Sequence, residues 1–240
     1  MPHATRVAAL FVYNEVVHNF KDISSISGVA HARTQDQQEM LRSKARLWGE
    51  EATVGNKPAS SSNFAHPETN VAAMHIDPGM KVADFGAGSG AYVLAAARAV
   101  GRTGRVYAVD VQKDLLTRIQ HNALREKIDW VDIIWGDFET PGGTKIKDNS
   151  IDLVILSNVL FQLDHAPRAF AEALRVLKQG GRLAVIDWMD SFGGMGPPAK
   201  RVVPKDKALE YAQAAGLTLL REFPAGAHHY GILLKADAKV

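Results

Sequence analysis

The sequence predicts a doubly wound α/β domain built on a mainly parallel, seven-stranded sheet whose last strand is antiparallel. Short apolar runs alternate five times with helical patterns between residues 81 and 216, which is typical of a parallel sheet with helices on both faces. The run 151–156 is almost unbroken in its apolar character, as expected for a strand covered on both faces. Residues 217–223 and 229–235 are separated by a short turn, so these two strands are expected to pair antiparallel.

The other elements follow from hydrophobic periodicity and from turn residues. A helix over 113–126 places Leu115, Leu116, Ile119 and Leu124 on one stripe. Gly180 and Gly181 are expected to stop the helix that begins at Ala166. The remaining strands are predicted at 82–85, 105–110, 130–135 and 182–187, and the remaining helices at 64–75, 91–100, 166–178 and 205–215.

The first 63 residues differ in character from the rest of the chain. Residues 5–20 have an apolar stripe typical of a helix, and residues 34–48 predict a second, more polar helix. Residues 53–63 are rich in Gly, Asn, Pro and Ser, a composition typical of a linker. We therefore predict a helical extension over 1–63, serving either as a lid over the substrate or as a partly disordered appendage, and a ligand-binding domain over 64–240.

The composition narrows the classes of function. The chain has 240 residues, a formal net charge of +2 and no cysteine, so disulfides, thiolate nucleophiles and cysteine metal sites are excluded from it. No run of five like charges is present, which makes a nucleic-acid-binding tail unexpected. The longest apolar run near the start, 7–13, is too short to span a membrane. Without a clear signal peptide, a cytoplasmic protein is expected.

Residues 81–92, KVADFGAGSGAY, are the strongest functional motif. A strand, a glycine-rich turn and a helix form a cradle in which the backbone can approach a ligand closely. Gly86, Gly88 and Ala91 satisfy the dinucleotide fingerprint G-x-G-x-x-G/A. Asp84, however, would repel a pyrophosphate and would suit S-adenosylmethionine, which carries an amino group and a sulfonium. A glycine-rich turn without a ligand is the third interpretation.

The ends of the next two strands carry further acids. Asp110 can accept both hydroxyls of a ribose, or it can cap the helix that follows. Asp137 can accept the amino group of adenine while the ring of Phe138 packs on the base, or it can simply be a turn acid. Because ligands of doubly wound sheets bind at the carboxyl ends of the strands, these acids are expected to lie beside the glycine loop.

The fourth and fifth strands end on the side where a substrate is expected. Ser157 and Asn158 should face a methyl group and its acceptor, and they are not part of the Asn-Pro-Pro-Tyr motif of nucleic-acid amino methylation. Trp188 is a candidate wall of the substrate pocket, with Asp190 nearby. The candidates for a general base, which such a reaction does not require, are His66, Asp187, His228 and His229.

A metal site near the C-terminus is not expected. Neighbours on a strand face opposite ways, so only His228 and Tyr230 could share a metal. No carboxylate stands at a ligand spacing.

Five motifs together carry a family resemblance: DFGAGSG (84–90), YAVD (107–110), GDFE (136–139), IDLVILSNVL (151–160) and RVLKQGGRL (175–183). Over residues 64–235 the chain resembles the class I S-adenosylmethionine-dependent methyltransferases, particularly the group of ubiquinone/menaquinone-type C-methyltransferases. Gln179 stands where that family usually has Pro. The closing antiparallel hairpin also favours this fold over the dinucleotide fold.

The resemblance implies a Rossmann-like methyltransferase fold, S-adenosylmethionine as cofactor and in-line methyl transfer to a small-molecule acceptor. An NAD(P)-dependent oxidoreductase, an RNA methyltransferase and a non-catalytic methyltransferase-like module are the alternatives. The implied cofactor-binding residues are Asp84, Gly86, Ala87, Gly88, Gly90, Asp110, Val111, Asp137, Phe138, Ser157 and Asn158.

Overall fold

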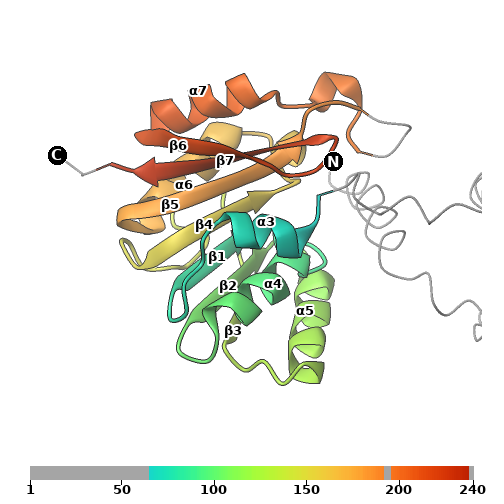
Figure 1. Cartoon of the computed structure of the whole chain (residues 1–240), viewed down its shortest axis with the longest axis vertical. Coiled ribbons are helices and arrows are strands. Elements are labelled where there is room, and N and C mark those ends of the chain that lie inside the picture. The colour runs from blue at the N-terminus through green and yellow to red at the C-terminus, as the bar shows by residue number, and fades with distance from the viewer. Residues whose placement is uncertain (1–64, 192–195, 238–240) are drawn as a thin grey trace, which may run out of the picture. The chain divides into compact units, whose positions relative to one another are not determined.

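The computed structural model describes residues 65–191 and 196–237 (Figure 1). The helices and the linker predicted within residues 1–63 lie outside these residues. The strands are β1 (Lys81–Phe85), β2 (Arg105–Asp110), β3 (Val131–Trp135), β4 (Ile151–Ser157), β5 (Leu177–Trp188), β6 (Leu217–Pro224) and β7 (His229–Ala236). The helices are α3 (Pro67–Ala73), α4 (Ala91–Val100), α5 (Lys113–Arg125), α6 (Ala166–Val176) and α7 (Lys205–Ala215), with short 3₁₀ turns η1 (Leu160–Gln162) and η2 (Ala199–Arg201).

The strands form one seven-stranded sheet in the order β3-β2-β1-β4-β5-β7-β6. Strands β1 to β5 pair in parallel, whereas β7 is inserted between β5 and β6 and is antiparallel to both. The predicted doubly wound sheet with an antiparallel last strand is therefore confirmed.

Helices cover both faces of this sheet, and strand alternation divides the core between them. On the side that we call the α4 face, α3, α4 and α5 pack on Val82, Val106, Leu153, Ala184 and Leu233. On the opposite side, the α6 face, α6 and α7 pack on Ala83, Val154, Leu183, Ile232 and Leu234. A side chain on a strand can therefore be assigned to a face by counting in twos from these residues.

The strand ends define two edges of the sheet. The carboxyl edge holds the ends of β1 to β5, and because β7 runs the other way, its start lies there too, with His229 paired to Trp188. The amino edge holds the starts of the parallel strands, beginning at Lys81 and Arg105.

The predicted boundary between the helix 166–178 and the strand 182–187 is wrong. The helix expected over 166–178 ends at Val176, and residues 177–181 already belong to β5. Leu177 is fully buried and pairs with Ile151, so tertiary packing overrides the helical pattern. Gly180, with φ of +72°, lies within an irregular part of the strand and does not stop the helix.

No helix within residues 65–191 and 196–237 has both the length and the apolar character needed to cross a membrane.

Candidate functional site

The glycine loop between β1 and α4 is held in an unusual backbone conformation. Gly86, Gly88 and Gly90 have φ of +78°, +53° and +84°, a region that residues with a side chain rarely occupy. A Cβ on Gly86 would lie 2.8 Å from Val159, and one on Gly90 would lie 2.6 Å from Ile119. Two of these glycines are thus required by the packing of the protein itself, in addition to any need of a ligand.

The loop is tied to the neighbouring strand and leads into an uncapped helix. The amides of Gly86 and Ala87 donate to the carbonyl of Val109 at 2.8 and 3.0 Å. Gly90 is the N-cap of α4, and no side chain caps this end. The first amides of α4 are therefore available to a ligand at the carboxyl edge.

Asp84 is buried beneath this loop. It is 2% exposed, and alternation from Val82 places its side chain on the α4 face. Burial, together with the nearby charge of Asp110, raises the pKa of Asp84 to about 7. A cationic group bound beside Asp84 would favour its ionised form, whereas a pyrophosphate would be repelled by it.

Asp110, at the end of β2, supports the loop. Its Oδ2 accepts the amide of Gly88 at 2.9 Å, and its Oδ1 accepts the amide of Gln112 at 2.8 Å. Burial raises the pKa of this carboxyl, and the hydrogen bonds from these two amides oppose the shift. Gln112, not Asp110, is the N-cap of α5. A carboxylate offers about four acceptor positions, so Asp110 keeps acceptor capacity for a hydroxyl of a ribose.

At the end of β3 the two predicted residues have different surroundings. The carboxylate of Asp137 accepts the amide of Glu139 at 2.8 Å and the hydroxyl of Thr140 at 3.1 Å, so it shapes the turn. The ring of Phe138 is buried and stacks on Phe85, with ring centroids 5.5 Å apart. The ring of Phe138 therefore belongs to the core, and contact between these two residues and a cofactor remains a prediction.

The exposed apolar surface at this end of the carboxyl edge comes from Val111 and Trp135. Their exposed fractions are 55% and 54%, and the indole of Trp135 donates to the carbonyl of Val111 at 3.0 Å. The ammonium of Lys113 lies 4.0 Å from the centre of the indole ring. The sequence analysis did not identify Trp135 as a candidate site residue. The apolar pattern of β3 does not show which of its side chains are covered by a helix and which are exposed.

The turn after β4 is held by Asp187, which is fully buried on β5. Its Oδ2 accepts the amides of Val159 and Leu160 at 3.1 and 2.9 Å. Burial raises the pKa of Asp187 to about 6, although these bonds and one from Trp188 oppose the shift. Asp187, a candidate base, is thus committed to positioning the turn.

That turn presents two polar atoms that have no partner. Asn158 adopts φ of +54°, a conformation that Asn tolerates better than most residues. The Oγ of Ser157 and the Oδ1 of Asn158 are buried and make no hydrogen bond. Buried polar atoms without a partner are rare and call for an explanation, such as a ligand. The structure thus brings both residues to the carboxyl edge, where the sequence predicted them.

The other candidate bases lie at or near this edge. His66 directly precedes α3 as its N-cap. The Nδ1 of His228 lies 3.0 Å from Asp190, and the buried ring of His229 lies 4.2 Å from that of Trp188. The hydroxyl of Tyr230 donates to Val203 at 3.1 Å, a residue packed on the opposite face.

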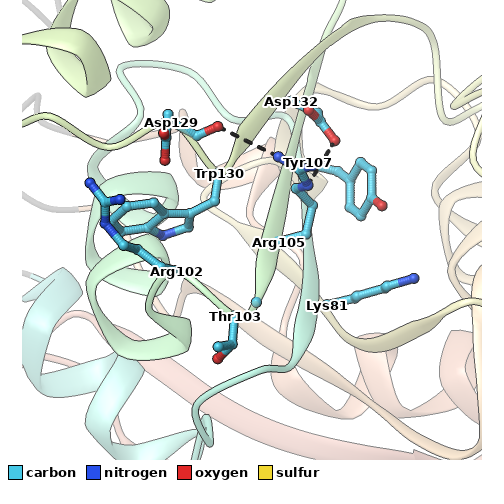
Figure 2. Close-up of a pocket in the computed structure, with 9 residues that line it drawn as sticks. Lys81, Arg102, Thr103, Arg105, Tyr107, Asp129, Trp130 and Asp132 are labelled. Atoms are coloured by element: carbon cyan, nitrogen blue, oxygen red, sulfur yellow. Dashed lines mark hydrogen bonds and ion pairs between the residues drawn. The ribbon is translucent and has the colours of Figure 1, made fainter.

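A cavity of about 660 Å³ lies at the amino edge, away from all of these residues. It is lined by Lys81, Arg102, Arg105, Trp130 and Asp132, among others. Figure 2 shows Arg105 between the two aspartates of the cavity and Arg102 beside the ring of Trp130. None of the predicted site residues contributes to it. Ligands of doubly wound sheets bind at the carboxyl edge, so this cavity does not mark the functional site.

The residues at the carboxyl edge fit S-adenosylmethionine. The uncapped start of α4 can bind a carboxylate, and Asp84 can balance an ammonium group. Asp110 has acceptor positions left for the ribose. Ser157 and Asn158 offer unpartnered oxygen atoms. These features come from the ends of three strands, β1, β2 and β4, which are neighbours at one edge of the sheet.

Comparison with known proteins agrees with this geometry. Residues 83–185 match the family model described as a methyltransferase domain. An arsenite methyltransferase of Halobacterium salinarum is 31% identical over 110 residues, which is 46% of this chain and 27% of that protein. A ubiquinone/menaquinone biosynthesis C-methyltransferase of Burkholderia cenocepacia is 32% identical over 118 residues, 49% of this chain and 47% of that protein. The chain thus spans half or less of the length of these curated relatives.

Solved structures show the same fold. A SAM-dependent methyltransferase from Aquifex aeolicus superimposes with a TM-score of 0.66 at 24% identity, covering 81% of this chain and 97% of that one. The [4+2]-cyclase SpnF gives 0.62 at 19% identity, covering 89% and 100%. Residues 83–185 are thus similar to methyltransferase domains, and the described residues share the fold of the S-adenosylmethionine-dependent methyltransferase structure, in agreement with the motifs. A cyclase among its structural neighbours shows that this fold alone does not fix the reaction.

Proposed function

We propose that the chain is an S-adenosylmethionine-dependent methyltransferase that transfers a methyl group in line to a small-molecule acceptor. The observation that carries the proposal is the pairing of the glycine loop with two buried acids. Asp84 and Asp110 stand at the ends of adjacent strands, and the carboxylate of Asp110 holds the loop at Gly88. Acids in these positions suit a cofactor with an ammonium group and a ribose, and they disfavour one with a pyrophosphate.

S-adenosylmethionine supplies a methyl group that is already activated by its sulfonium. The task of the protein is then chiefly to hold the acceptor in line with the bond that breaks, and such orientation can supply roughly 7–11 kcal/mol at the upper end. The buried carboxylate of Asp187 fixes the turn that carries Ser157 and Asn158. This turn is the part of the chain suited to positioning the acceptor.

The relatives act on different acceptors, and the composition bears on the choice between them. The matched Halobacterium protein is named for arsenite, and trivalent arsenic is a soft centre that favours thiolate ligands. The present chain contains no cysteine. The absence of thiolates supports an organic small molecule, as for the Burkholderia relative, over arsenite.

Calorimetry with S-adenosylhomocysteine, S-adenosylmethionine and NAD⁺ tests the assignment of the cofactor. We expect the first two to bind and NAD⁺ not to bind. Transfer of a labelled methyl group to a panel of small organic acceptors and to RNA then tests the reaction, with incorporation expected only in the former. Binding of NAD⁺ in place of the methylated cofactor would overturn the proposal.

A further inference from the structure

Four side chains form a row on one face of the sheet at the carboxyl edge. Counting in twos from residues of the α4 face places Asp84, Ser157, Trp188 and His229 on that same face. They come from β1, β4, β5 and β7, which are consecutive in the sheet. The contact between the rings of Trp188 and His229 agrees with this placement. The row is stepped, because Asp84 pairs with Ile155, Ser157 with Ile186 and Trp188 with His229. It therefore crosses three strand spacings of about 4.8 Å each while also advancing along the strands.

The far end of this row is a histidine whose polar atoms are unused. His229 is 2% exposed, and neither of its ring nitrogens makes a hydrogen bond. Within residues 65–191 and 196–237, the other side chains with a buried polar atom that has no partner are those of Ser157 and Asn158, at the same edge. A buried polar group without a partner costs stability. The presence of three such residues at the edge of the cofactor site indicates that their polar atoms bind a ligand.

The protonation state of His229 suits a hydrogen-bond acceptor. Burial, with a smaller contribution from the charge of His228, lowers the pKa of His229 to about 4, although Asp190 opposes the shift. At neutral pH the ring is therefore uncharged and has one nitrogen with a free lone pair. The ring of Trp188 supplies an apolar wall next to it.

We propose that His229, together with Ser157, forms the part of the site that binds the methyl acceptor, and that the acceptor presents a hydroxyl or amino hydrogen to the imidazole. The inference rests on the proposed function and deepens it. Asp84 marks the cofactor end of the row, Ser157 lies at the next strand, and His229 lies at the acceptor end. An acceptor of one or two rings would bridge the two strand spacings and the two-residue step along the strands between Ser157 and His229, roughly 12 Å in all.

His229→Phe separates this role from a structural one. If the imidazole is kept for a ligand, its replacement by an apolar ring removes a buried unpartnered group, and the Tm should rise by about 2–4 °C. The affinity for S-adenosylhomocysteine should stay within twofold. Transfer of labelled methyl to catechol and tyramine, probes that carry hydroxyl and amino hydrogens, should fall at least tenfold in kcat/KM.

Two further variants complete the test. Tyr230→Phe is the matched control, because Tyr230 is the next residue on β7, faces the other way and donates a hydrogen bond to Val203. It should lower the Tm and leave methyl transfer unchanged. Ser157→Ala should keep the fold and reduce transfer to the same probes.

Three results would overturn the inference: a lower Tm for His229→Phe, unchanged methyl transfer by that variant, or a wild-type protein that binds S-adenosylhomocysteine but methylates neither probe. The third would leave the cofactor assignment standing. Failure of the wild-type protein to bind S-adenosylhomocysteine would instead remove the proposed function itself.

Discussion

The two edges of the sheet differ in the burial of their charged side chains. At the carboxyl edge Asp84, Asp110 and Asp187 are buried, and burial raises the pKa of each. At the amino edge, Arg105 and Asp132 form an ion pair whose side chains are 43% and 46% exposed. The amino edge nevertheless holds a cavity of about 660 Å³. The functional edge is therefore distinguished by its buried polar groups, which cost stability. The volume of a cavity does not distinguish it.

The helices explain why the cations gather at the amino edge. In this fold the helices that follow the parallel strands end there, and their C-termini carry partial negative charge. Arg98 lies in the last turn of α4 and Arg125 in that of α5. These cations complement the helix ends and need no ligand to account for them. The starts of the helices that follow parallel strands, which favour anions, lie at the carboxyl edge.

The largest expected difference between the edges concerns two glycines with the same backbone conformation. Gly90 at the carboxyl edge has φ of 84° and ψ of 14°, and Gly216 at the amino edge has 89° and 29°. Ala at either position incurs the left-handed cost of about 1–2 kcal/mol. Only at Gly90 would the new Cβ also clash, 2.6 Å from Ile119, which adds about 1–3 kcal/mol. Urea unfolding should show Gly90→Ala as clearly the less stable variant, and equal losses would contradict this account.

The second prediction concerns pH and the cofactor. The pKa of Asp84 is raised to about 7, so in the free domain this carboxyl is largely protonated at pH 5–6. A bound ammonium group favours the ionised form, so binding of S-adenosylhomocysteine should release a proton. The affinity should then increase by up to about tenfold per pH unit between pH 5 and 7, and level off above that.

Calorimetry at pH 6 in two buffers of different ionisation enthalpy would measure the released proton. Asp84→Asn is the control and should abolish the release. The raised pKa also means that Asp84 stabilises the free domain below about pH 4, a contribution that is lost as the pH rises through about 7. A pH-independent affinity in the wild-type protein would show that no cation binds beside Asp84.

The third prediction compares one acid at each edge. Asp110→Ala removes the acceptor of the Gly88 and Gln112 amides and the remaining acceptor capacity for a ribose. We expect it to weaken binding of S-adenosylhomocysteine at least tenfold, about 1.4 kcal/mol. Asp132→Ala, made in the same way on β3, should leave this affinity unchanged. Equal effects of the two variants would mean that Asp110 has no contact with the cofactor.

The smallest expected effect is that of the amino-edge ion pair on stability. The Nε of Arg105 and the carboxylate of Asp132 are 3.5 Å apart, and both side chains are well exposed. Such pairs typically contribute about 0–1 kcal/mol, so the free energy of unfolding of Asp132→Ala should differ from wild type by less than about 1 kcal/mol. A larger loss of unfolding free energy in urea would mean that this ion pair stabilises the fold more than exposed pairs usually do.

The sequence alone determined the fold class, most element boundaries and the cofactor motifs. These depend on local signals: alternation of apolar residues, glycines at positive φ, and acids that directly follow buried strands. The end of α6 was misplaced, because the burial of Leu177 against Ile151 is a contact between segments distant in the chain. The stacking of Phe138 on Phe85 is likewise a contact between distant segments, and the expected contact of Phe138 with a cofactor stays a prediction.

Only the tertiary structure decided which polar groups are free to act. From the sequence, Asp187, His228 and His229 were equal candidates for a role in the reaction. The fold commits Asp187 to two backbone amides, pairs His228 with Asp190, and leaves both nitrogens of His229 without a partner. The physical reason is that a hydrogen bond depends on where two residues meet in space, and no local pattern in the chain records that distance.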